Sequence, residues 1–243
     1  MILYIFLAVF VYLCPFDGGY ALANENLKNL VTSFGSRVDD PIADRYLDEG
    51  RLDEAIFLHK KLLEKKPLAG IVHYHLGFAY GLKGLYDEEI AEYEKAIKLG
   101  HKEEGLFYNL GMAYIDLETD YKRAVDAFNK VIQLNPKHAE AYFNLGLSYQ
   151  NLGNYRKATE SLLKAIQLNP AHLEAYNVLG VVYALSGQPH KAREAWMEIL
   201  KQDPSNRPAL INLETLNKTR PEPNAAPRSQ KMVESSPTKI STK

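Results

Sequence analysis

Residues 139–170 read AEAYFNLGLSYQNLGNYRKATESLLKAIQLNP, and this stretch decides the fold. Apolar residues recur in its first half at spacings of three and four, which is typical of an amphipathic helix: Tyr142, Leu145, Tyr149 and Leu152. Gly153 and Asn154 interrupt that helix. A second apolar stripe follows and ends at Pro170, because proline cannot continue a helix and disfavours helix one residue earlier. The stretch therefore predicts two helices joined by a tight turn.

The same unit recurs along the chain. Leu-Gly pairs begin at residues 76, 110, 145 and 179, so the spacings are 34, 35 and 34. In this register the five copies span 36–69, 70–103, 104–138, 139–172 and 173–206. One pair of helices cannot bury its own apolar face, whereas stacked pairs can bury a continuous one. The repetition therefore predicts a stacked helical array.

The copies resemble the tetratricopeptide repeat, a helix–turn–helix unit, and the resemblance covers Ser36 to Asn206. It implies an all-α fold, a right-handed superhelical α-solenoid of about five repeats. Residues 207–218 start a sixth copy that stops halfway, which predicts a C-terminal capping helix.

Three copies depart from the pattern, the third by one inserted residue near Glu118-Thr119-Asp120, which predicts a longer turn. In the first copy, Ala43 replaces the glycine of the Leu-Gly pair. In the second, Glu89 stands where later copies have Ala158 and Ala192. Glu89 has two interpretations: local variation with a carboxylate that reaches solvent, or a partly buried acid at a flexible junction. Gly146 and Ala158 are small where the two helices of their copy should cross, which predicts a close approach of the backbones.

Both ends of the chain differ from the array. Ile2 to Leu13 is an unbroken apolar run, and Ala21-Leu22-Ala23 fits the small-x-small pattern before a cleavage site. Residues 1–23 are therefore predicted to be a cleaved signal peptide; a retained N-terminal anchor and a buried helix are the alternatives. Residues 24–35 predict a short helix, and 219–243, rich in Pro, Ser and Lys, predict a disordered tail. We expect an exported protein of the periplasm or cell envelope.

Composition and motifs exclude several classes of function. The net charge of −1 argues against a nucleic-acid-binding protein. The single cysteine, Cys14, excludes a disulfide within the chain. No catalytic motif is present, so we expect neither an enzyme nor a cofactor. No metal site is predicted: His73 and His75 lie two residues apart and point in different directions on a helix, while His138 and His172 are equivalent positions of the repeat.

The resemblance implies that the first helix of each copy lines a concave groove that binds a protein or peptide partner. The candidate groove residues are Tyr74, Phe78, Tyr108, Asn109, Met112, Phe143, Asn144, Leu147, Asn177 and Asn212. The recurring asparagines are similar to asparagine ladders that hydrogen-bond the backbone of an extended peptide. Alternatively, the asparagines are ordinary solvated residues of the repeat, and the aromatic residues pack between neighbouring helices.

We therefore predict a non-enzymatic scaffold that binds an extended peptide or a short helix. The alternative function is a structural or oligomerising component of a bacterial envelope complex. No nucleic acid is expected as a partner, membrane contact is expected only through an uncleaved N-terminal segment, and the oligomeric state is left open.

Overall fold

The computed structural model describes residues 41–118 and 120–218, and within these ranges the chain is built from α-helices. Their bounds are α3 Pro41–Asp48, α4 Leu52–Lys65, α5 Gly70–Leu82, α6 Tyr86–Lys98, α7 Glu104–Glu118, α8 Tyr121–Leu134, α9 Ala139–Asn151, α10 Tyr155–Leu168, α11 Leu173–Leu185, α12 Pro189–Gln202 and α13 Arg207–Lys218. The predicted signal peptide, the short helix over 24–35, the start of the first copy and the tail over 219–243 lie outside the described residues.

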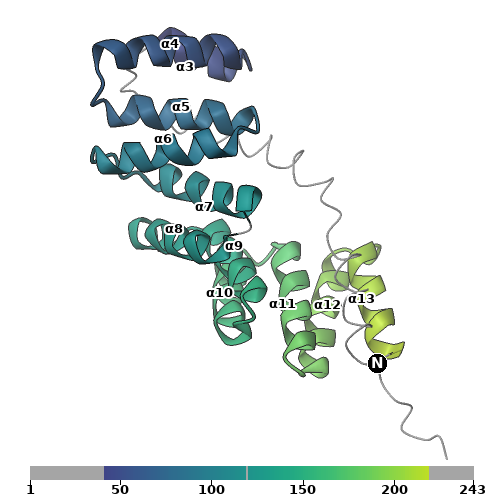
Figure 1. Ribbon diagram of the computed structural model, residues 1–243. Coiled ribbons are helices and arrows are strands. Elements are labelled where there is room, and N and C mark those ends of the chain that lie inside the picture. The colour runs from purple at the N-terminus through teal and green to yellow at the C-terminus, as the bar shows by residue number, and fades with distance from the viewer. Residues whose placement is uncertain (1–40, 119, 219–243) are drawn as a thin grey trace, which may run out of the picture.

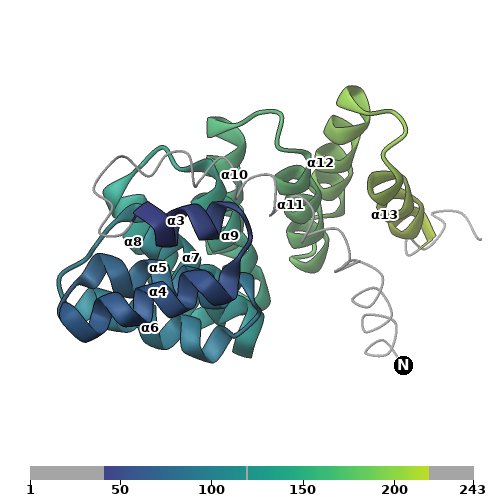
Figure 2. The same ribbon diagram turned by 90° about the horizontal axis from the view of Figure 1, so that it is seen from above.

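The helices stack in chain order, and the stack curves from α3 at one end to α13 at the other (Figures 1 and 2). Each helix packs against the next one along the chain. The first helices of neighbouring pairs are also in contact: α5 contacts α7, and α9 contacts α11. The architecture is the α-solenoid that the repeated pattern predicts, with α13 packed on α12. Among the helices of the described ranges, none is both long and apolar enough to cross a membrane.

Local sequence explains where the helices begin and end. Gly153, which separates α9 from α10, has φ +72°, a conformation that glycine adopts without strain. The side chain of Asn154 then accepts a hydrogen bond from the backbone N–H of Lys157, so it caps the N-terminus of α10. Asp120 caps α8 in the same way, and Pro189 occupies the first turn of α12, where no backbone donor is needed.

A glycine on each of the first helices α5, α7, α9 and α11 allows the second helix of the pair to approach closely. A Cβ atom on Gly146 would lie 2.6 Å from Cγ of Leu162 and 3.3 Å from the backbone oxygen of Ala158. The same relation joins Gly77 to Tyr93 and Gly111 to Phe128. The missing side chain leaves room for the large residue opposite it, so the crossing expected at Gly146 and Ala158 is present.

The structure contradicts one of the two interpretations of Glu89 that were made from the sequence. Its side chain does not reach solvent: the residue is 7% exposed and lies against Gly81, where a Cβ would be 2.5 Å from its Cδ. Burial raises the pKa of this carboxyl to about 8. The positions equivalent to Gly81 in later copies are Ile115, Gln150 and Ala184. Only in the second copy is a glycine on the first helix combined with a large residue, Glu89, on the second.

Candidate functional site

The predicted groove residues lie on the first helices α5, α7, α9 and α11 and on the capping helix α13. Six of them are buried: Tyr74, Phe78, Asn109, Phe143, Asn144 and Asn212. The other four are partly buried: Tyr108, Met112, Leu147 and Asn177. Most of the predicted surface is thus covered by the protein itself, and the binding role of these residues stays a prediction.

The asparagines connect neighbouring repeats to each other. The side-chain amide of Asn144 donates a hydrogen bond to the hydroxyl of Tyr108 at 3.1 Å, and Asn109 donates to the hydroxyl of Tyr74 at 3.5 Å. At the C-terminal end, Asn212 donates to the side-chain oxygen of Asn177 at 2.8 Å. Each bond spans 35 or 36 residues, which is about one repeat. The asparagine ladder therefore connects α5 to α7, α7 to α9 and α11 to α13. A buried amide that lost its partner would cost about 1–3 kcal/mol.

Histidines from the loops between repeats cover the aromatic rings. The ring of His138 stacks on Tyr108 with centroids 5.1 Å apart, and His172 lies 4.7 Å from the ring of Phe143. His172 also reaches Glu140, at the start of its own copy, at 3.3 Å between Nε2 and Oε2, and this contact lowers the pKa of that carboxyl. The aromatic side chains therefore pack between helices, and replacing one of them would disturb the repeat interface as well as any ligand contact.

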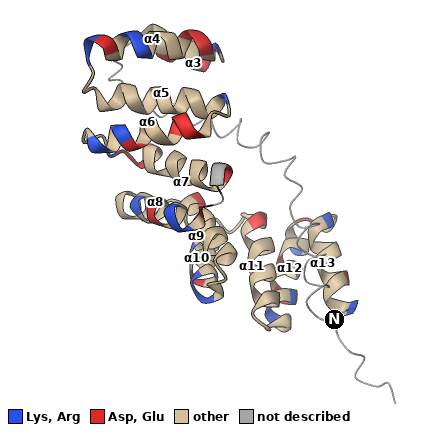
Figure 3. Ribbon diagram, in the orientation of Figure 1, with Lys and Arg blue, Asp and Glu red and all other residues tan. Residues whose placement is uncertain are grey.

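Charge is distributed unevenly between the two helices of the pairs that begin with α5, α7, α9 and α11. The sequences of α5, α7, α9 and α11 contain no lysine or arginine, whereas the second helices carry most of the charged residues (Figure 3). A surface on these four helices therefore has no lysine or arginine for a peptide's C-terminal carboxylate. It suits apolar side chains and backbone amides instead.

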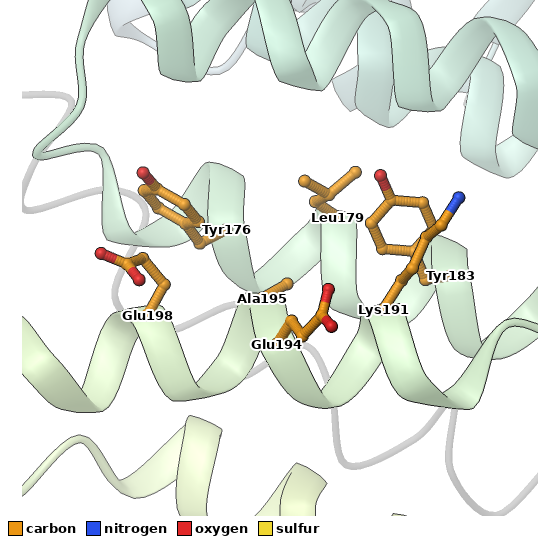
Figure 4. A pocket seen from close by; sticks show the side chains of 7 residues that line it. All are labelled: Tyr176, Leu179, Tyr183, Lys191, Glu194, Ala195 and Glu198. Atoms are coloured by element: carbon orange, nitrogen blue, oxygen red, sulfur yellow. The ribbon is translucent and has the colours of Figure 1, made fainter.

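A pocket of about 500 Å³ lies on α11 and α12, and sequence reasoning did not find it. Tyr176, Leu179 and Tyr183 of α11 form one wall, and the other is formed by residues of α12: Lys191, Glu194, Ala195 and Glu198. Tyr176 and Glu198 lie at one end, Tyr183 and Lys191 at the other, with Leu179 between them (Figure 4). Tyr176 and Tyr183 are seven residues apart, which places them on one face of a helix, and this spacing is the feature of the sequence that indicates the pocket.

The pocket combines aromatic and acidic groups. The Nζ of Lys191 lies 5.4 Å from the centroid of the Tyr183 ring. Burial and the neighbouring Glu194 raise the pKa of the Tyr183 phenol. At the other end, one oxygen of Glu198 pairs with Lys201 at 2.6 Å. Two tyrosine rings and Leu179 offer apolar contact, and Glu194 offers a carboxylate to a basic group.

Comparison with protein families explains the repeated pattern. Models described as tetratricopeptide repeat match residues 41–103, 139–172 and 161–194, and one described as TPR repeat matches 120–153. The chain belongs to the tetratricopeptide repeat family. Proteins built from these repeats are generally non-enzymatic scaffolds for protein–protein interaction. A comparison with curated protein sequences gave no significant match.

Solved structures of tetratricopeptide repeat proteins are similar to this one. YrrB, a TPR protein with an unusual peptide-binding site, is 28% identical with a TM-score of 0.68, over 71% of this chain and 88% of that one. A structure of MamA is 29% identical with a TM-score of 0.63, over 74% and 99%. MamA from Desulfovibrio magneticus RS-1, at 23% identity and a TM-score of 0.63 over 74% and 97%, shows the same fold.

Proposed function

We propose that this tetratricopeptide repeat protein is an exported scaffold that binds an extended segment or a short helix of a partner protein. The observation that carries the proposal is the pocket on α11 and α12. It adds a recess with partly buried aromatic side chains to an array of a family whose members bind proteins. The peptide-binding site of YrrB supports the same class of ligand.

The side chains that line the pocket restrict which kind of partner segment can bind there. A segment that inserts one apolar side chain between Tyr176 and Tyr183 would bury surface against Leu179. A lysine or arginine next to that side chain would face Glu194, which is exposed on α12. The favoured ligand therefore carries an apolar residue beside a basic one.

Photo-crosslinking tests this binding in the native host. A photoreactive residue at position 183 is expected to capture one partner protein, because that side chain lines the pocket. The matched control is position 149, which lies 34 residues earlier and also has a lysine over its ring, Lys157 at 5.1 Å. Glu194→Lys should abolish capture at 183 without unfolding the helices, as circular dichroism would verify.

Two results would contradict peptide binding at this pocket. Identical adducts at positions 149 and 183 would indicate contacts that do not depend on the pocket. Adducts formed only with a second copy of this chain would favour the oligomerising alternative.

Export is the second part of the proposal. It is supported by the apolar run from Ile2 to Leu13 and by the cleavage pattern at Ala21-Leu22-Ala23. The intact mass of the protein isolated from the cell envelope should correspond to a chain that starts at Asn24. A full-length mass in the membrane fraction would favour the retained anchor, and a full-length chain in the cytosolic fraction would contradict export.

A further inference from the structure

Three potential metal ligands meet at the N-terminal end of the array: Asp44 of α3, His59 of α4 and His75 of α5. Each offers one ligand atom, and these atoms lie within 4.8 Å of one another. Oδ1 of Asp44 is 3.1 Å from Nδ1 of His75 and 3.9 Å from Nε2 of His59. The imidazole rings are tilted by 58° with centroids 5.6 Å apart. The cluster is unrelated to the pocket on α11 and α12.

All three residues depart from the repeat at their positions. His59 is equivalent to large apolar residues of the later second helices: Tyr93, Phe128, Leu162 and Trp196. Asp44 is equivalent to apolar residues of the later first helices: Phe78, Met112, Leu147 and Val181. His75 is equivalent to Asn109 and Asn144 of the asparagine ladder. The repeat therefore does not explain an imidazole or a carboxylate here, and the three departures converge in space.

We propose that Asp44, His59 and His75 bind a divalent transition-metal ion, with zinc as the best fit. Two imidazoles and one carboxylate are a ligand set that zinc accepts, at about 2.0–2.2 Å from the metal. In a tetrahedral site such bond lengths separate neighbouring ligand atoms by about 3.3–3.6 Å. The two distances from Oδ1 of Asp44, 3.1 and 3.9 Å, bracket this range, and the two imidazole ligand atoms lie within 4.8 Å of each other, so side-chain rotations would complete the site.

Burial supports a site that is shielded but reachable. The side chain of His59 is 1% exposed, while those of Asp44 and His75 are 23% and 17% exposed. The ion can thus enter from the side of Asp44 and His75, and a water molecule supplies the fourth ligand. Because the ligands come from three helices, the ion would join α3, which has only eight residues, to α4 and α5.

Metal titration of the tag-free full chain tests the site. We expect one Zn²⁺ per chain by calorimetry and, with Co²⁺, the visible absorption of a tetrahedral complex. Asp44→Asn and His75→Gln should each weaken Zn²⁺ binding by about 100-fold or more, because even residues that only support a ligand are worth about 10–100-fold. Matched controls are Asp48→Asn, an exposed position on the same helix, and His190→Gln, an exposed histidine of α12.

Hydrogen exchange provides a readout that does not depend on variants. Zn²⁺ should slow amide exchange in α3, α4 and α5 and leave α13 unchanged, and Mg²⁺ should have no effect. The proposal is overturned if the unaltered chain binds no Zn²⁺, or if Asp44→Asn and His75→Gln bind it as well as the two controls do. In that case the three side chains form only a network of ion pairs.

Discussion

Replacing Gly146 with leucine is expected to lower the free energy of unfolding by about 3 kcal/mol. Even the Cβ atom of the new side chain would lie 2.6 Å from Cγ of Leu162, and the backbone oxygen of Ala158 is 3.3 Å away. The two helices must separate to admit the leucine, and α9 and α10 then lose part of the contact that buries Leu162, which is fully buried. Urea denaturation followed by circular dichroism measures the loss.

Gly153→Ala is the matched control in the turn of the same repeat. Nothing lies within 4 Å of a Cβ atom at Gly153, so the substitution introduces no clash. Its φ of +72° is strained for alanine, and we expect a cost of about 1 kcal/mol. Equal losses for Gly146→Leu and Gly153→Ala would contradict the close crossing of α9 and α10.

Glu89→Gln is expected to stabilise the protein by about 2–4 kcal/mol at pH 8 and above. Burial raises the pKa of Glu89 to about 8 from an ordinary value of 4.5, so the folded chain retains a proton that the unfolded chain releases. Stability from this group is therefore complete below pH 4.5 and falls as the pH rises to about 8. Glutamine has the same length and carries no charge, so it removes this loss.

The pH dependence of the difference between the two proteins is the decisive measurement. The free energy of unfolding of Glu89→Gln minus that of the unaltered chain should rise from pH 5 to pH 8 and then level off. Glu88→Gln changes the neighbouring exposed carboxylate and should give a flat difference over the same range. A flat difference for Glu89→Gln as well would mean that the carboxylate finds solvent when it ionises.

The asparagine ladder shows how much of a candidate site can be predicted from the spacing of the repeats. The recurrence of Asn109 and Asn144 placed them at equivalent positions of the first helices, but it could not say which side of the helix a partner covers. In the structure the partner is the preceding repeat, since Asn144 bonds to Tyr108 across 36 residues. An interface between repeats and a ligand groove both favour recurring polar residues, so recurrence alone does not separate them.

The sequence by itself determined the helices, the turns and the order of stacking in this protein. These features depend on residues close along the chain: apolar spacing within a helix, a glycine with positive φ between helices, and a side chain that caps the next turn. Because the unit repeats, the same pair of helices and the same turn recur along the array.

Only the tertiary structure decided the burial of Glu89, the pocket beside Tyr183, and the meeting of Asp44 with His59 and His75. The physical reason is common to all three. Each depends on the volume or the donor atoms of a residue on another helix, and a side chain's own spacing carries no information about that neighbour. Glu89 is buried because Gly81 leaves space for it, and no pattern within α6 states that the space exists.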